Sequence, residues 1–209
     1  MTGRTLLVAT KNAGKLREYE RLLGPLGCEV VGPADIGLDL DVEETADTFE
    51  GNARLKALAL AAAAGQLALA DDSGLEVDAL GGEPGVRSSR WVPGADADRV
   101  RALLDRLRGV DDAGRTARFR AVAAVADPDG RVKTASGAVE GRIAWAPRGE
   151  NGFGYDPVFL VEDGGLAGDR TAAELAPAEK DRLSHRGRAL RNLWPQLEAA
   201  LNEGVVDPD

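Results

Sequence analysis

Short runs of apolar residues recur along the chain and end in turn-forming residues, a pattern that is typical of β-strands. Four such runs predict strands at residues 5–9, 29–31, 67–70 and 157–161. Two further extended segments, residues 119–125 and 132–139, flank the turn Asp127-Pro128-Asp129-Gly130 and predict a long hairpin.

Longer segments carry apolar residues at the three- and four-residue spacing of a helix face. This spacing predicts helices near residues 12–23, 48–66 and 98–107. A capping box of the form Thr171-Ala172-Ala173-Glu174 and a following Pro177 predict the start of a last helix, which carries the chain's one histidine. Strands that alternate with helices, together with one hairpin, predict an α/β fold with a mixed sheet.

The length and composition suit a single domain. A chain of 209 residues, 44% of them hydrophobic, can form one complete core, so we expect one domain over residues 1–209, with linker-like segments at 163–168 and in the acidic tail after about residue 202. One cysteine excludes an internal disulfide framework. Neither an export signal nor an apolar stretch of membrane-spanning length is visible, so we expect a soluble, cytoplasmic protein.

The net charge of −9 changes which partners are expected. An acidic protein repels nucleic-acid backbones and anionic membranes, so we expect neither a nucleic-acid polymer nor a membrane as a partner. A small anionic ligand remains compatible with the sequence where local donors or a metal ion outweigh the overall field.

The segment Thr10-Lys11-Asn12-Ala13-Gly14-Lys15 joins the first predicted strand to the first predicted helix. A helix that starts here points backbone N–H groups and the positive end of its dipole at the loop, and Gly14 allows a phosphate to approach closely. Lys11 and Lys15 add charge, and Asn12 either caps the helix or donates to a phosphate oxygen. The segment lacks the Walker spacing. It predicts a polyphosphate-binding loop, with a capped helix and solvated lysines as the alternative.

Two acidic groups suggest a metal site. Asp71-Asp72-Ser73-Gly74 stands where the strand at 67–70 is expected to end, and Glu43-Glu44 precedes the helix at 48–66. Carboxylates suit Mg²⁺, and alternation along a strand leaves one of the two aspartates on a given side. An acidic turn and a solvated loop are the alternatives. Metal, phosphate donors and a carboxylate that activates water are the parts that phosphoryl chemistry needs.

Three further groups could contact a nucleotide. Asn52 and Lys56 are spaced to share one helix face and suit phosphates. Gly152-Phe153-Gly154-Tyr155-Asp156 offers a flat ring and a hydrogen-bond acceptor to a base or sugar. The last group is Lys180, Ser184, His185 and Arg186, in which His185 and Arg186 together supply hydrogen-bond donors to a keto-rich ring edge. The alternatives are an ordinary amphipathic helix, a plain turn and a structural histidine.

Taken together, these segments resemble the inosine/xanthosine triphosphate pyrophosphatase family, which removes non-standard purine nucleoside triphosphates. The resemblance covers nearly the whole chain and departs from the usual pattern at Lys11, where the family generally has glycine. It rests on the following matches, in order: Thr10-Lys11-Asn12-Ala13-Gly14-Lys15, Glu43-Glu44, Thr48-Phe49 with Asn52-Ala53 and Lys56-Ala57, Ala70-Asp71-Asp72-Ser73-Gly74-Leu75, Gly152-Phe153-Gly154-Tyr155-Asp156-Pro157, Thr171-Ala172-Ala173-Glu174-Leu175, and Glu179-Lys180 followed by Ser184-His185-Arg186-Gly187.

The resemblance implies an elongated α/β fold with two lobes around a central cleft, a Mg²⁺ requirement, a homodimer, and hydrolysis of ITP, dITP or XTP to monophosphate and pyrophosphate. It makes Asp72 the catalytic proton acceptor and Glu44 and Asp72 the metal ligands, although the choice between Glu43 and Glu44 stays open. The substrate contacts that it implies are Thr10, Lys11, Asn12, Ala13, Gly14, Lys15, Lys56, Ser73, Phe153, Gly154, Tyr155, Asp156, Lys180, His185 and Arg186.

Two alternatives compete with this interpretation. One is a Maf-like pyrophosphatase that acts on pyrimidine or modified nucleotides, which the donor pair His185-Arg186 disfavours. The other is a nucleotide-binding sensor that does not hydrolyse its ligand, which the presence of Glu44 and Asp72 disfavours.

Overall fold

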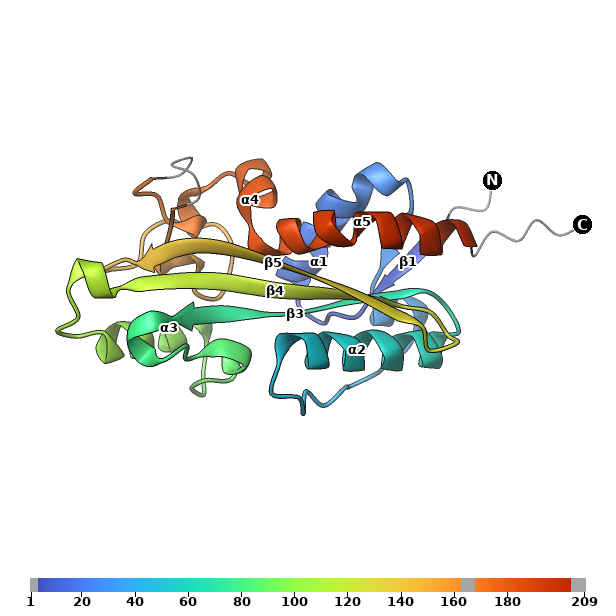
Figure 1. Ribbon diagram of the computed structural model, residues 1–209, viewed down its shortest axis with the longest axis horizontal. Helices are drawn as coiled ribbons and strands as arrows, with labels where there is room; N and C mark the ends of the chain where they lie inside the picture. The colour runs from blue at the N-terminus through green and yellow to red at the C-terminus, as the bar shows by residue number, and fades with distance from the viewer. Residues whose placement is uncertain (1–3, 163–167, 204–209) are drawn as a thin grey trace, which may run out of the picture. The chain divides into compact units, whose positions relative to one another are not determined.

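The computed structural model describes residues 4–162 and 168–203, with the side chains from 203 onward left out (Figure 1). The predicted linker-like segment at 163–168 and the acidic tail fall mostly outside these residues. The strands of the described part are β1 (Thr5–Val8), β2 (Glu29–Val31), β3 (Ala68–Val77), β4 (Thr116–Ala126), β5 (Val132–Ile143) and β6 (Phe159–Val161). Its α-helices are α1 (Ala13–Leu23), α2 (Phe49–Ala64), α3 (Asp96–Arg106), α4 (Pro177–Leu183) and α5 (His185–Glu203).

The strands form one mixed sheet in the order β2-β1-β3-β4-β5-β6. Strand β1 pairs in parallel with both β2 and β3, whereas β5 and β6 pair antiparallel. Parallel strands need crossover connections, and the helices supply them. The predicted α/β fold with a mixed sheet is therefore confirmed.

The described residues group into two compact units. The first contains the chain up to Asp72, Val122–Gly137 and the part from Ala189 onward, and the second contains Ser73–Ala121 and Ala138–Arg188. The single domain with a central cleft stays a prediction.

In the first unit, both faces of the strands are covered. Leu6, Leu7 and Val8 are consecutive in β1 and all fully buried, which requires packing on each side of the strand. Figure 1 shows α2 on one side of these strands, and α1 and the later part of α5 on the other. The core under α2 consists mostly of alanine, whose small side chain lets a helix approach a sheet closely, together with two leucines: Leu7, Ala53, Ala57, Leu60, Ala61, Ala68, Ala70, Ala124 and Ala126.

In the second unit, the strands have one buried face. Along β4, the buried residues Ala117, Phe119 and Ala121 alternate with the more exposed Arg118 and Arg120. The buried face packs with Val100 and Leu103 of α3 in one apolar cluster. On the opposite face, Arg118 forms ion pairs with Glu76 of β3, with Asp78 just after β3, and with Glu140 of β5.

Two predicted boundaries are wrong. The strand expected to end at Ala70 continues as β3 to Val77 and carries Asp71 and Asp72 in its middle. The predicted last helix is two helices, because Ser184 is extended between α4 and α5 and its Oγ accepts the Gly187 N–H at 3.1 Å. This serine caps α5, so the helix with the histidine begins at His185 rather than at Pro177.

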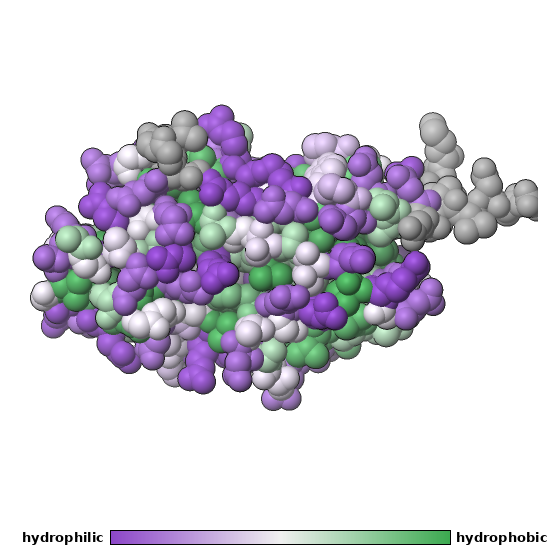
Figure 2. Space-filling model, viewed as in Figure 1, coloured by the Kyte–Doolittle hydropathy of each residue, from purple (hydrophilic) through white to green (hydrophobic). Residues whose placement is uncertain are grey.

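On the face seen in Figure 2, hydrophilic residues predominate and hydrophobic residues lie among them in small groups. Within the described ranges, no helix combines the length and the apolar character that a membrane span needs.

Candidate active site

The loop between β1 and α1 forms a capped helix start. The Asn12 Oδ1 atom accepts the N–H groups of Gly14 at 2.8 Å and Lys15 at 3.1 Å, and Thr10 Oγ1 accepts the Asn12 N–H at 3.1 Å. Of its two predicted roles, Asn12 therefore takes the capping role here. The exposed Ala13 opens the helix, where the dipole favours an anion.

Lys15 connects this loop to β3. Its Nζ atom lies 3.1 Å from Asp71 Oδ2 and 3.3 Å from Asp71 Oδ1, and the Asp71 side chain is almost fully buried. The pair joins the first turn of α1 to the middle of β3 and holds a partly buried cation beside the predicted phosphate loop.

Asp72 points to the other side of β3, toward α2, as alternation along a strand requires. Its Oδ2 atom accepts from Asn52 Nδ2 at 3.1 Å, and its Oδ1 atom lies 3.6 Å from Lys56 Nζ. The same ammonium donates to Glu44 Oε1 at 2.7 Å. Asn52 and Lys56, which were predicted to share one helix face, thus both contact Asp72. The four side chains form one cluster, which we call the Asp72 cluster.

Burial and charge shift the ionisation of this cluster. Burial raises the pKa of the Asp72 carboxyl above its ordinary value; the Lys56 ammonium opposes this rise and the Glu44 carboxylate adds to it. Burial lowers the pKa of Lys56, but the carboxylates of Asp72, Asp71 and Glu44 outweigh it and leave that pKa raised. The result is a carboxylate of increased basicity beside a lysine that stays charged.

The donor set of the Asp72 cluster fits a hard divalent cation. Glu44 and Asp72 each present a carboxylate oxygen to the same ammonium, so the two oxygens lie no further apart than the sum of those two contacts. Mg²⁺ is commonly held by one or two carboxylates and completed by water and phosphate oxygens. The part of the chain that the structure describes has no group of three or more His, Cys, Asp or Glu side chains placed to hold a metal, so this pair of carboxylates would need water and phosphate oxygens to complete the coordination. Glu43, the other predicted candidate, is exposed.

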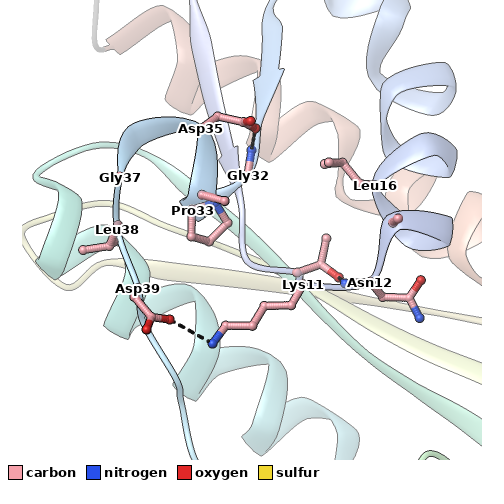
Figure 3. A pocket seen from close by; sticks show the side chains of 12 residues that line it. Lys11, Asn12, Leu16, Gly32, Pro33, Asp35, Gly37, Leu38 and Asp39 are labelled. Atoms are coloured by element: carbon pink, nitrogen blue, oxygen red, sulfur yellow. Dashed lines mark hydrogen bonds and ion pairs between the residues drawn. The ribbon is translucent and has the colours of Figure 1, made fainter.

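Lys11 lines a pocket of about 500 Å³, in which its side chain extends toward Asp39 (Figure 3). Its Nζ atom lies 3.2 Å from Asp39 Oδ1 and 3.9 Å from Asp41 Oδ1, and all three side chains are largely exposed. Exposed pairs of this kind contribute little to stability. The pocket is lined by Thr10, Lys11, Asn12, Ala13, Leu16, Gly32, Pro33, Ala34, Asp35, Gly37, Leu38 and Asp39.

In the second unit, two cations face the Phe153 ring. Lys180 Nζ lies 4.9 Å from the ring centroid, and the Arg186 guanidinium lies 5.8 Å from it. Arg186 also donates to Ser73 Oγ at 3.2 Å. The fold therefore brings together four residues that the sequence analysis took from three distant segments.

The loop that carries Phe153 is anchored on both sides. Asp156 Oδ2 accepts the Phe153 N–H at 2.9 Å and pairs with Lys180, while the Gly154 N–H donates to Asp96 Oδ2 at 2.7 Å. The Tyr155 hydroxyl donates to the Ser88 carbonyl at 3.1 Å, and burial raises the pKa of this phenol to about 12. Gly154 and Tyr155 thus use their polar groups to hold the loop in shape.

His185 stands at the first turn of α5. Its ring stacks on Phe119, with centroids 4.8 Å apart and planes inclined by 14°, and it is almost fully buried, as is Arg186.

Sequence reasoning missed Phe119, Asp96 and Ser88, because nothing local marks an apolar strand residue or a helix-start aspartate as a support for a loop far away in the chain. The roles of the predicted site residues in binding and catalysis stay predictions.

The chain is similar to known proteins over nearly its full length. The sequence profile of the Ham1 family matches residues 6–196. A dITP/XTP pyrophosphatase of Symbiobacterium thermophilum is 54% identical over 207 residues, which are 98% of this chain and 100% of that protein. The dITP/XTP pyrophosphatase of Bacillus subtilis is 47% identical over 195 residues, 92% of this chain and 96% of the relative.

Structural comparison agrees. The solved Staphylococcus aureus Ham1 protein superposes with a TM-score of 0.79 at 39% identity, over 93% of this chain and 98% of that one. The resemblance inferred from the motifs is confirmed. With a family profile that spans most of the sequence and relatives at this level of identity, the chain belongs to the Ham1 family.

Proposed function

We propose that this protein hydrolyses non-standard purine nucleoside triphosphates such as dITP and XTP to the monophosphate and pyrophosphate. The observation that carries the proposal is the Asp72 cluster, in which two carboxylates and Lys56 converge, while the adjacent Asp71 binds Lys15 at the capped start of α1. Similarity to relatives named dITP/XTP pyrophosphatases supports the same substrate class.

The loop at residues 10–15 and Lys56 hold the triphosphate in this proposal. The N-terminal end of α1, Lys15 beside Asp71, and Lys56 beside Asp72 offer positive charge to the triphosphate. Negative charge builds on the leaving pyrophosphate in the transition state. Interactions that strengthen with this charge lower the activation barrier of hydrolysis, whereas interactions that are equally strong in the bound substrate do not. Lys11 adds its charge only where a phosphate competes with Asp39 and Asp41.

Asp72 is the proton acceptor. One water molecule adds to the α-phosphorus, the bond to the bridging oxygen breaks, and a proton from that water passes to the Asp72 carboxylate. Burial raises the pKa of Asp72, which makes it a better base than an exposed aspartate. The substrate and water together give the monophosphate and pyrophosphate, with no further reactant.

A divalent cation is general among nucleoside triphosphate pyrophosphatases, and we propose Mg²⁺ held by Glu44 and Asp72. When bound, the ion neutralises charge that develops on the leaving pyrophosphate. The supporting observation is the hard oxygen pair that both residues direct at one cation, the Lys56 ammonium.

In this proposal, residues of the second unit recognise the purine base. Phe153 offers a stacking surface, and Ser73, Lys180, His185 and Arg186 offer donors. Hypoxanthine and xanthine present an acceptor oxygen at position 6, whereas adenine presents an amino donor there and leaves such donors unpaired. Unpaired buried polar groups are the basis of strong discrimination between substrates. A homodimer, which the family resemblance implies, and the cytoplasmic location expected from the sequence complete the proposal.

The test is a comparison of kcat/KM, with direct detection of pyrophosphate, across dITP, XTP, dATP, dGTP, dUTP and dCTP, each with and without Mg²⁺. The proposal predicts strong preference for dITP and XTP and loss of activity without a divalent ion. Preference for a pyrimidine nucleotide favours the Maf-like alternative, and binding without turnover of any nucleotide favours the sensor.

A further inference from the structure

Asn52 connects the two predicted metal-binding segments through one side chain. It lies in the second turn of α2, and its side chain is completely buried. Its Nδ2 atom donates to Asp72 Oδ2 at 3.1 Å, and its Oδ1 atom accepts the Ala46 N–H at 2.9 Å. One rigid amide therefore holds a carboxylate of β3 at one end, and backbone two residues after Glu44 at the other.

The segment that carries Glu44 also packs directly on α2 at Gly51. A Cβ atom added at Gly51 would lie 2.5 Å from the Ala46 Cβ and 3.0 Å from Thr48 Oγ1. Two non-bonded carbon atoms do not approach to 2.5 Å, and neither methyl group could turn away. Ala46 can therefore occupy this position only because residue 51 is glycine. This close approach brings the Ala46 N–H within reach of Asn52.

The two contacts of Asn52 fix how the carboxylates face each other. Because Asn52 holds Asp72 Oδ2, it is Asp72 Oδ1 that faces Lys56, the ammonium to which Glu44 Oε1 also binds. Both ends of the Asn52 amide are thus bound to protein atoms, which differs from the phosphate-binding role expected from the sequence.

We propose that Asn52 is a positioning residue that sets the spacing and orientation of the Glu44 and Asp72 carboxylates for a shared divalent cation. The inference rests on the proposed function, since it assumes that these two carboxylates hold the metal. Residues that orient metal ligands in this way commonly alter metal affinity by about 10- to 100-fold when replaced.

The first variant is Asn52→Asp. It keeps an oxygen that accepts the Ala46 N–H but replaces the donor to Asp72 by a second carboxylate oxygen, which repels Asp72. We expect the Mg²⁺ concentration for half-maximal dITP hydrolysis to rise by about 10- to 100-fold, and kcat at low Mg²⁺ to fall more than KM for dITP rises. The matched control is Asn192→Asp, which makes the same chemical change in α5 and loses an exposed hydrogen bond to the Ser136 carbonyl; we expect its Mg²⁺ dependence to stay unchanged.

The second variant acts on the Glu44 segment without touching Asp72. Gly51→Ala drives the added methyl group against Ala46 and displaces the segment. The double variant Ala46→Gly/Gly51→Ala removes the opposing methyl group and restores the space. We expect the single variant to raise the Mg²⁺ concentration for half-maximal dITP hydrolysis, as Asn52→Asp does, and the double variant to return it most of the way to the wild-type value.

A readout independent of turnover is Mn²⁺ binding by electron paramagnetic resonance, with the protein alone and with α,β-methylene-dITP present. We expect Asn52→Asp and Gly51→Ala to bind Mn²⁺ more weakly than wild type, while circular dichroism shows a folded protein. Unchanged Mn²⁺ affinity and Mg²⁺ dependence in both variants, with wild type active on dITP, overturn the inference and leave the proposed function standing. A wild type that binds no Mn²⁺ in either arm, or that releases no pyrophosphate from dITP, overturns the proposed metal site or function, and the inference with it.

Discussion

Lys180 Nζ lies 2.6 Å from Asp156 Oδ2, and both side chains are at least nine-tenths buried. The same carboxylate oxygen accepts the Phe153 N–H, so one buried ion pair joins α4 to the loop that presents the Phe153 ring. The pair holds that loop by charge as well as by hydrogen bonding.

Replacing Asp156 by asparagine should therefore destabilise the protein strongly. The change keeps the size of the side chain but leaves the Lys180 ammonium buried opposite a neutral group, and we expect a loss of about 3–5 kcal/mol in the free energy of unfolding. Urea denaturation measures this loss. Asp105→Asn, which breaks the exposed pair with Arg108, is the control and should cost less than about 1 kcal/mol. Equal losses in the two variants would contradict the account of the buried pair.

Asp72→Asn should abolish most turnover and preserve the fold. Asparagine keeps the shape of the side chain but cannot accept the proton of the attacking water, so kcat should fall by about 10²- to 10⁴-fold, with metal misplacement adding to the loss. The control is Asp71→Asn, which weakens the hold on Lys15 and should affect KM more than kcat. Turnover near that of wild type in Asp72→Asn, or a larger loss of kcat in Asp71→Asn, would show that the wrong aspartate has been assigned.

Removing the donors His185 and Arg186 together should narrow the preference for ITP over ATP. Losing donors to the oxygen at position 6 penalises only substrates that used them, so kcat/KM for ITP should fall far more than for ATP. Lys15→Ala removes a charge from the predicted phosphate loop instead and should weaken both substrates by similar factors. If the double alanine variant loses activity on ITP and ATP equally, the pair acts on phosphate or on structure, and the account of selectivity is wrong.

The phenol of Tyr155 should make stability depend on pH in the alkaline range. Its pKa is raised by burial to about 12 in the folded protein, above the ordinary tyrosine value of about 10. The raised pKa means that the unfolded chain ionises first, so this contribution is complete below about pH 10 and is lost as pH rises toward about 12. The unfolding free energy of wild type should therefore fall relative to Tyr155→Phe over that range, and a constant difference would show that the phenol ionises normally.

Most elements could be predicted from the sequence because their signals are local. The helix spacing of α1, α2 and α3 and the turn between β4 and β5 each lie within a single segment. The course of β3 through Asp71 and Asp72 could not be predicted in this way. Two adjacent aspartates indicate a turn unless their partners are known, and those partners, Lys15 on one side and Asn52 and Lys56 on the other, lie far away in the sequence.

The candidate site shows the same limit. Motifs suggested its residue types, but not which groups touch, nor that Glu44 rather than Glu43 meets Lys56. Arg115 gave no signal at all, although its buried guanidinium donates to the carbonyls of Leu107, Ile143 and Ala144. A buried arginine bound to backbone carbonyls depends on three segments meeting in space, which no periodicity encodes.

The most direct test of the proposed reaction is the position of bond cleavage in dITP. Hydrolysis is run in water enriched in ¹⁸O, without a coupling enzyme. The products are then separated, and their masses are determined by mass spectrometry. Attack at the α-phosphorus predicts one ¹⁸O atom in the monophosphate and none in pyrophosphate. Label in pyrophosphate, or dIDP together with labelled inorganic phosphate, would place the attack at the β- or γ-phosphorus and contradict the proposed function.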